Sequence, residues 1–349
     1  MLRCAGFTMS QEIIPSERAI LLSPQSKEFA VQWESLMRLK PTPIIKDLLS
    51  EQLLELKKLQ QFDYWRENLN QEFENDQGVW CYFSWLNQLI RIVSPNNYLL
   101  LRLARNIPKT EMNELQILRK KRIGIVGMSV GQSILRCLAI EGIGGHFSIA
   151  DFDDLEITNL NRIHAGIHQS GLKKTTIASR FIAELDPYVE ISIFNKGINP
   201  DNIEAFIGNN DLIIEECDDI GVKKLVRQHC KARGVPVLMD TSDQLMIDVE
   251  RFDYDKSRPV FHGLIEKSTT EIPEIIRLLE PEKCSERGRR SLAEIGKKIP
   301  SWPQLASDVQ LGSALTAKLA RAILLGHTIP SGRFRCDIMQ LFQSHLEHR

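Results

Sequence analysis

The clearest folding signal in the sequence is the stretch RIGIVGMSVGQSILRCLAIEGIGGHFSIADFD, residues 122–153. An apolar run ends in glycine at residue 127, a helical pattern follows over 133–144, and a second apolar run ends in acidic residues at 151–153. This order predicts two parallel strands joined by a crossover helix. The same alternation of short apolar runs and longer helical patterns continues to about residue 243. We therefore predict a doubly wound α/β fold with a mostly parallel sheet.

The first hundred residues have a different texture. Four leucines recur at helical spacing within residues 43–69, namely Leu49, Leu53, Leu56 and Leu59. Residues 80–105 are rich in aromatic and aliphatic side chains and are predicted to form a second, packed helical region. We therefore expect an N-terminal helical extension at residues 1–100 and an α/β domain at residues 101–340.

Composition excludes several classes of protein. The 349 residues are 43% hydrophobic and 26% charged, as in ordinary globular proteins, and no run approaches the roughly 18 apolar residues of a membrane span. Lys plus Arg (44) and Asp plus Glu (45) give a net charge of -1, so no global charge favours nucleic acid. The N-terminal residues are too polar for a signal peptide, which predicts a cytoplasmic protein without a membrane or nucleic-acid partner. The seven cysteines never form a C-x-x-C pair, which favours neither a disulfide framework nor a thiolate zinc site.

The turn after the first strand is the natural place for a ligand, because small molecules bind beyond the carboxyl ends of parallel strands. A dinucleotide loop would read G-x-G-x-x-G; here Gly127 and Gly131 are present, with Ser129 and Gln132 at the other positions. A purely structural turn fits this loop as well. Asp151, at the end of the next strand, could accept hydrogen bonds from ribose hydroxyls or could simply cap a loop.

The stretch DFDDLEITNLNR, residues 151–162, resembles the ThiF/MoeB/HesA family, the bacterial relatives of ubiquitin-activating enzymes. These enzymes use ATP to adenylate the C-terminal carboxylate of a ubiquitin-like protein or a peptide. The segments MDTSDQLMIDVERFD, NLNRIHAG and WPQL are most similar to ThiF-like halves fused to nitroreductase-like domains. The resemblance implies a Rossmann-like nucleotide-binding adenylation domain over residues 101–340.

The resemblance also implies roles for individual residues. The nucleotide-binding positions are Gly127, Ser129, Gly131, Asp151, Asp153, Asn159, Asn161 and Lys173. The catalytic positions are Arg162, Lys174 and Arg105, the last of which would reach the ATP of the partner subunit in a homodimer. Asp218 in DLIIEECDD takes the place of the acid associated with Mg²⁺, and Asp219 stands where the family has Asn. ATP and Mg²⁺ are the implied cofactors.

These residue types suit adenylation, since a carboxylate that attacks the α-phosphate of ATP brings two anions together and needs positive charge around them. The chain departs from the family in two ways. It lacks the two C-x-x-C pairs of zinc-binding members, so no zinc is expected. Cys284 is the cysteine best placed to accept an activated carboxylate, but an exposed, non-catalytic role is favoured, although Lys283 and Arg287 could lower its pKa.

Two functions from different classes follow. The leading one is ATP-dependent adenylation of a ubiquitin-like protein, sulfur-carrier protein or peptide. The alternative is a catalytically altered nucleotide- or partner-binding module that assists a flavin or nitroreductase-like enzyme, which would be a separate polypeptide. A Rossmann oxidoreductase is disfavoured because nothing near the first turn resembles an acid–base pair for hydride transfer. His164 and His168 lack a third metal ligand nearby in sequence.

Overall fold

The computed structural model describes residues 17–69, 71–241, 243–265, 278, 280–339 and 342. The chain forms two compact units. Unit 1 contains the described residues up to Lys109 together with Ile182–Tyr188, and unit 2 contains Thr110–Phe181 and the described residues from Val189 onward. Each unit is described by itself.

Unit 2 is built on a seven-stranded sheet with the order β11-β10-β9-β8-β5-β6-β7. The strands are β5 (Arg122–Val126), β6 (His146–Ala150), β7 (Glu190–Phe194), β8 (Leu212–Glu215), β9 (Val237–Thr241), β10 (Met246–Glu250) and β11 (Gly332–Phe334). Pairing is parallel from β7 through β6, β5 and β8 to β9, whereas β10 and β11 are antiparallel to their neighbours. The predicted α/β class with a mostly parallel sheet is confirmed.

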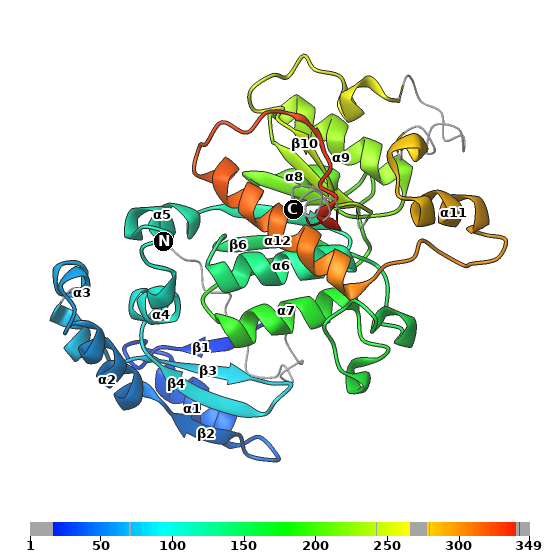
Figure 1. Ribbon diagram of the computed structural model, residues 1–349. Coiled ribbons are helices and arrows are strands. Elements are labelled where there is room, and N and C mark those ends of the chain that lie inside the picture. Colours follow the sequence, from blue (N-terminus) through cyan, green and yellow to red (C-terminus); the bar gives the residue numbers. More distant parts are fainter. Residues whose placement is uncertain are drawn as a thin grey trace. The chain divides into compact units, whose positions relative to one another are not determined.

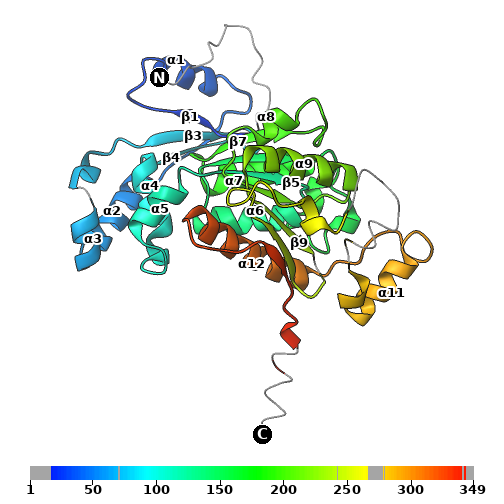
Figure 2. The ribbon, with the colours of Figure 1, turned by 90° about the horizontal axis from the view of Figure 1, so that it is seen from above.

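Helices cover both faces of this sheet (Figures 1 and 2). The helices of unit 2 are α5 (Met112–Leu118), α6 (Val130–Glu141), most of α7 (Lys174–Leu185), α8 (Ile203–Ile207), α9 (Ile220–Arg233), α11 (Glu286–Glu294) and α12 (Ala306–Leu324). α6, α7 and α12 lie on one face, and α8 and α9 lie on the other. The guanidinium of Arg136 on α6 stacks 3.6 Å from the ring centroid of Phe181 on α7. The inner strands β5, β6, β8 and β9 are therefore buried on both faces, which explains their nearly continuous apolar residues.

The strand order creates a switch point between β5 and β8. From β5 the chain passes to β6 and β7 on one side, then returns to β8 and β9 on the other side. The connections that leave the carboxyl ends of β5 and β8 therefore run to opposite faces and diverge, which opens a crevice at this edge of the sheet. The predicted ligand turn at Gly127 follows β5 directly.

Unit 1 departs from the prediction. It contains a four-stranded sheet with the order β1-β3-β4-β2. Its strands are β1 (Ile20–Leu22), β2 (Ile44–Asp47), β3 (Val79–Phe83) and β4 (Gln88–Ile92), and its helices are α1 (Phe29–Met37), α2 (Leu49–Leu59), α3 (Asp63–Asn68) and α4 (Pro95–Leu103). The N-terminal extension is therefore not purely helical as predicted. The helix expected within residues 43–69 is instead one strand followed by two helices.

The error at residues 80–105 has a physical cause. VWCYF and QLIRI are rich in aromatic and β-branched residues, which suit a pleated surface, and they form the antiparallel β3–β4 hairpin. Asn87 adopts a left-handed conformation (φ 49°) in the connecting turn, and its side chain accepts a hydrogen bond of 3.1 Å from the Tyr82 hydroxyl. Pro95 then begins α4, where a missing N–H costs nothing. Only the last part of the predicted helical region is helical.

In the part of the chain that the structure describes, no helix has the length and hydrophobicity to cross a membrane.

Candidate functional site

The turn between β5 and α6 makes close backbone contact with the end of β8. Gly127 has φ +87°, a conformation that L-residues with side chains rarely adopt. A Cβ at this position would lie 2.7 Å from the carbonyl oxygen of Glu216, so glycine is required for steric reasons as well. Gly131 brings α6 against β5, where an added Cβ would meet the Ile125 side chain at 2.9 Å. Both predicted glycines thus shape the switch-point crevice.

Asp151 organises the loop that follows β6. Its carboxylate accepts hydrogen bonds from the backbone N–H of Met128 at 2.6 Å and of Asp153 at 2.7 Å. Burial raises the pKa of Asp151, against the opposing effect of these two hydrogen bonds and of the Lys174 charge. The Asp151 side chain therefore fixes the glycine turn relative to the β6 end, and the remaining lone pairs of its oxygens are what a ribose would use.

The two predicted lysines have different environments. Lys174 begins α7 and is buried, and its ammonium group forms a 2.7 Å ion pair with Asp153. Lys173 pairs with Asp154 at 2.8 Å and donates to the carbonyl oxygen of Phe152 at 2.8 Å. Lys174 and Asp153 thus belong to the same loop cluster as Asp151, whereas Lys173 fastens the edge of that loop.

Arg162 connects the β6–α7 loop to the glycine turn. Its Nε donates to the hydroxyl of Ser129, at the N-cap position of α6, at 2.8 Å, and its Nη1 donates to the Asn161 side chain at 2.9 Å. Burial lowers the pKa of Arg162, and the charge of Asp218 opposes this effect. The structure therefore brings the predicted Ser129, Arg162 and Asp218 into one electrostatic neighbourhood, next to the amino end of a helix that favours anions.

The two predicted asparagines mainly hold the loop. Asn159 is buried, and its side-chain oxygen accepts from the backbone N–H of Glu156 at 3.1 Å. Asn161 donates to the carbonyl oxygen of Gln304 at 2.8 Å, which ties the loop to the segment before α12. These contacts are internal to the protein.

The end of β8 carries the predicted metal-associated acid. Asp218 is exposed, and Asp219 beside it is the N-cap of α9, where its side chain accepts from the Val222 N–H at 2.9 Å. An asparagine caps a helix as well as an aspartate does, so Asp219 can replace the Asn of the resembled motif without loss of local structure. Arg105 lies in unit 1, in the 3-10 helix Ala104–Asn106, and is exposed.

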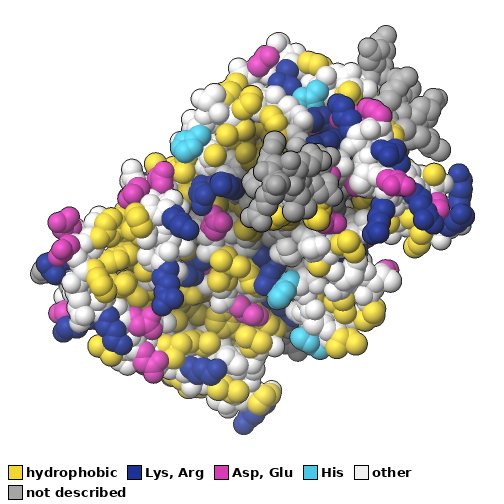
Figure 3. Space-filling model, in the orientation of Figure 1, with side chains coloured by type: hydrophobic (Ala, Val, Ile, Leu, Met, Phe, Trp, Pro, Cys, Tyr) yellow, Lys and Arg dark blue, Asp and Glu magenta, His cyan; other side chains and the backbone are white. Residues whose placement is uncertain are grey.

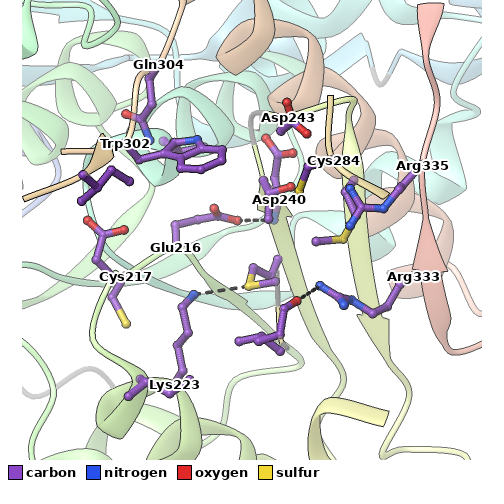
Figure 4. A pocket seen from close by; sticks show the side chains of 18 residues that line it. Glu216, Cys217, Lys223, Asp240, Asp243, Cys284, Trp302, Gln304, Arg333 and Arg335 are labelled. Carbon is purple, nitrogen blue, oxygen red and sulfur yellow. Dashed lines mark hydrogen bonds between the residues drawn. The ribbon is translucent and has the colours of Figure 1, made fainter. Parts of the chain in front are cut away.

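A cavity of about 240 Å³ lies beside these residues, at the ends of β8 and β9 (Figure 4). Its lining residues come from several separate stretches of unit 2: Val130, Glu216, Cys217, Asp218, Ile220, Lys223, Met239, Asp240, Thr241, Asp243, Met246, Leu278, Cys284, Ile295, Trp302, Gln304, Arg333 and Arg335. Of the residues predicted from sequence to form the site, Asp218 is the one in this lining. The cavity therefore adjoins the predicted nucleotide site without coinciding with it.

Two carboxyl groups in the cavity wall have strongly shifted pKa values. The Glu216 side chain accepts from the backbone N–H of Asp240 at 2.8 Å, and burial together with the Asp240 charge raises the pKa of Glu216 well above its usual range. Burial, with a smaller contribution from Asp308, raises the pKa of Asp240 to about 7. Perturbed carboxyl groups in a cavity often mark functional sites.

Behind the cavity lies a buried network of charges. Arg227 on α9 is fully buried and bonds Glu215 at 2.5 Å and Glu250 at 2.6 Å. Lys223 adds a third cationic contact, 3.0 Å from Glu215. Burial alone would raise the pKa of Glu215, but the charges of Lys223 and Arg227 together lower it to about 2. This network fixes the floor of the cavity and leaves its buried charges paired.

Cys284 differs from the prediction. It is buried rather than exposed, and burial together with the Asp243 charge raises the pKa of its thiol. Arg289 of α11 donates to the backbone carbonyl oxygen of Cys284 at 2.7 Å. The basic side chains of α11 are otherwise exposed and gather at one edge of the face in Figure 3. Because they do not surround the sulfur, they do not produce the lowered pKa that a reactive thiol needs.

Sequence reasoning missed Glu216, Asp240, Trp302, Arg333 on β11 and Arg335 just after it. The signal available for Asp240 was the acidic stretch MDTSD at the end of a predicted strand. It also missed Gln132, which is fully buried on α6 and whose side-chain amide has no hydrogen-bond partner among the described residues.

The family can be assigned by comparison with known proteins. The model of the ThiF family matches residues 102–276, half of the chain. The chain belongs to the ThiF family. Uncharacterized protein MT1398 of Mycobacterium tuberculosis (strain CDC 1551 / Oshkosh) is 38% identical over 269 residues, which are 74% of this chain and 38% of that protein.

Other relatives of this ThiF-family chain include adenylyltransferases. The adenylyltransferase and sulfurtransferase MOCS3 of Culex quinquefasciatus is 27% identical over 178 residues, 50% of this chain and 40% of that protein. The molybdopterin-synthase adenylyltransferase of Escherichia coli (strain K12) is 24% identical over 152 residues, 43% of this chain and 60% of that protein. The chain thus spans between 38% and 60% of the length of these three relatives. The solved structure of E. coli TcdA, a tRNA N6-threonylcarbamoyladenosine dehydratase, is 17% identical with a TM-score of 0.48, over 65% of this chain and 95% of that one.

Proposed function

We propose that this ThiF-family protein adenylates a carboxylate at the C-terminus of a ubiquitin-like protein, a sulfur-carrier protein or a peptide, at the expense of ATP. The observation that carries the proposal is the cluster at the switch point. The Gly127 turn, the α6 amino end, Arg162 and Asp218 meet there, and Asp151 lies within hydrogen-bond distance of the turn.

In the proposed reaction, a carboxylate oxygen of the acceptor attacks the α-phosphorus of ATP. A new carbon–oxygen–phosphorus linkage forms, and the bond between the α-phosphorus and the bridging oxygen breaks, so that pyrophosphate leaves. Both reactants are anions, and the transition state needs fixed positive charge. Arg162 is held toward the α6 amino end by Ser129 at 2.8 Å, and Lys174 is held by Asp153 at 2.7 Å, so both cations are oriented before a nucleotide binds.

The residues present also suit Mg²⁺. Among the residues that the structure describes, no cluster of three or more His, Cys, Asp or Glu could enclose a metal ion. Mg²⁺ in phosphoryl-transfer sites needs only one or two carboxylates, since phosphate oxygens and water complete its shell. Asp218 is an exposed carboxylate at the crevice and would supply that ligand. Bound Mg²⁺ would neutralise charge on the triphosphate and on the departing pyrophosphate.

The names of two relatives support adenylation as the reaction. One is the molybdopterin-synthase adenylyltransferase of E. coli, and the other is the adenylyltransferase and sulfurtransferase of C. quinquefasciatus. A tRNA threonylcarbamoyladenosine dehydratase of Haemophilus influenzae is also 28% identical over 129 residues, so the acceptor is the less constrained part of the proposal. We further propose a homodimer in which Arg105 reaches the partner's nucleotide. A separate flavin enzyme as partner also remains a prediction.

ATP–pyrophosphate exchange tests the proposed function. The chain would be mixed with radiolabelled pyrophosphate, ATP, Mg²⁺ and each candidate acceptor encoded beside its gene. We expect exchange with one acceptor and a fall of about 100- to 1,000-fold in Arg162→Ala and in Lys174→Ala, since each removes a charge from the transition state. Lys318→Ala makes the same chemical change at an exposed position on α12, outside the proposed site, so it serves as the matched control and should retain most of the activity. Full exchange in both Arg162→Ala and Lys174→Ala would refute the assignment, and ATP binding without exchange would favour the partner-binding module.

A further inference from the structure

The cavity beside Asp218 has an uneven distribution of charge. The cations in its lining are each engaged by acids: Lys223 pairs with Glu215, and Arg333 pairs with Asp248 at 3.1 Å and with Glu280 at 2.5 Å. Arg335 also faces Glu280, at 3.6 Å. These acidic partners lie outside the cavity lining, so they neutralise the cations without contributing negative charge to the wall.

Asp240 is placed differently from these paired cations. The residue is 5% exposed, and neither of its carboxylate oxygens has a hydrogen-bond partner among the described residues. α12 approaches it with Gly312, where even a Cβ would lie 2.0 Å from Oδ2, so the residue nearest to the carboxylate on this helix has no side chain that could donate. The charged groups that face Asp240 are the acids Glu216 and Asp308, and burial with the Asp308 charge raises the pKa of Asp240 to about 7. A buried carboxyl group without a donor is costly, and a ligand with N–H groups would satisfy it.

The other walls describe the rest of the ligand. Apolar side chains line much of the cavity, among them Val130, Ile220, Met239, Met246, Leu278 and Ile295. Trp302 adds an aromatic ring, which Figure 4 shows in the same part of the cavity as Asp240 and Glu216. Aliphatic walls suit the methylene stem of a lysine or arginine, and an aromatic face attracts the cation at its end. The volume of about 240 Å³ is below the roughly 300–1,000 Å³ of pockets for drug-sized ligands, so a single long side chain is a suitable occupant.

The cavity also reaches the reaction centre that we propose. Asp218 and Val130, the first residue of α6, belong to its lining. We propose that this cavity is a specificity pocket for the last residue of the acceptor, and that Asp240 selects a lysine or arginine side chain whose own α-carboxylate is presented for adenylation. This inference rests on the proposed function, because it identifies the acceptor of that same reaction.

Calorimetric titration with short peptides tests the inference without any turnover. The probes are acetyl-Gly-Gly-Arg, acetyl-Gly-Gly-Lys, acetyl-Gly-Gly-Leu and acetyl-Gly-Gly-Gly, all with free carboxylates, titrated into the full chain at pH 8. Agmatine, which carries a guanidinium but no carboxylate, distinguishes a free amine ligand from a peptide terminus. We expect the Arg and Lys peptides to bind at least 10-fold more tightly than the Leu and Gly peptides and than agmatine.

Asp240→Asn keeps the shape of the side chain and removes its charge, so it should reduce that preference to less than 3-fold. Asp201→Asn makes the same chemical change at an exposed position outside the cavity lining and should leave the preference intact. Equal binding of all four peptides, no binding of any of them, tighter binding of agmatine, or a preference that survives in Asp240→Asn would each overturn the inference. The comparison of peptides on the unchanged protein needs no variant to fold. Because no nucleotide is present, these results are independent of ATP–pyrophosphate exchange, which tests the proposed function.

Discussion

The sheet of unit 2 has two sides along its strand order, with β6 and β7 on one side of β5 and β8 to β11 on the other, and their charged groups are arranged differently. On the side of β6 and β7, the charged groups of the candidate site lie in or beside the β6–α7 loop and bond partners within that loop, as Arg162 bonds Asn161 and Lys174 bonds Asp153. On the side of β8 to β11, charges are buried and pair across elements, as Arg227 on α9 does with Glu250 on β10. The first arrangement leaves cations near an anion-binding helix end, and the second builds a rigid wall with an unsatisfied carboxyl group. We infer from this difference that one side serves the nucleotide and the other serves the acceptor.

Among substitutions that test this comparison, Arg227→Met should have the largest effect on stability. It removes the cation that Glu215 and Glu250 share in full burial, and it leaves two acids facing each other without that partner. We expect the free energy of unfolding, measured with urea, to fall by about 3–5 kcal/mol. Arg233→Met on the same helix breaks an exposed pair with Glu204 and should cost less than about 1 kcal/mol. Similar losses in the two variants would show that the buried network does not support the cavity side.

The pH dependence of the free energy of unfolding tests whether the Asp240 carboxyl group is buried without a partner. Its pKa is about 7 in the folded chain against 3.8 for an ordinary aspartate, so the folded state binds the proton more tightly. The contribution of Asp240 to stability is therefore fully present below pH 4 and is lost as the pH rises to about 7. Asp240→Asn should remove this loss, and so should gain on the order of 2–4 kcal/mol relative to the unchanged chain between pH 4 and pH 8. Parallel stability curves for the two proteins, measured by urea unfolding across this range, would contradict the placement of an unpaired acid in the wall.

Gly127→Ala tests the contact between the two sides. Alanine would have to adopt φ +87° and would also meet the Glu216 carbonyl, so we expect a loss of about 2–3 kcal/mol and weaker ATP binding. Gly171→Ala is a matched control with φ +83° and no neighbouring atom within 4 Å, and it should cost only about 1 kcal/mol. The difference between the two variants measures the close approach of the β5 turn to the end of β8. Equal losses would mean that this approach carries no strain.

The smallest expected effect concerns Asp219. Its carboxylate caps α9, so Asp219→Ala should lower the free energy of unfolding by about 1 kcal/mol in the same urea assay. Asp219→Asn should be nearly neutral, since asparagine is an equally good cap. A large loss in Asp219→Asn would assign this side chain a role beyond the helix end.

The residues of the β6 and β7 side could be predicted from the sequence, whereas most residues of the cavity on the other side could not. Gly127, Asp151, Arg162 and Lys174 lie in short contiguous motifs, and the structure places them around one loop because local sequence dictates it. The cavity combines residues as distant as Val130, Glu216, Trp302 and Arg333, which only the folded sheet brings together. In unit 1, hydrophobic density at residues 80–92 could not distinguish a buried helix from a hairpin, and β-propensity with a turn at Asn87 determined the outcome.

Direct measurement of nucleotide binding to the full chain tests the central claim most closely. ATP and NADH would each be titrated calorimetrically, with and without Mg²⁺, into the unchanged protein and into Lys174→Ala. We predict that ATP binds, that Mg²⁺ strengthens its binding, that Lys174→Ala weakens it at least 10-fold and that NADH does not bind. Tight binding of NADH with none of ATP, or no binding of either nucleotide, would contradict the proposed nucleotide site.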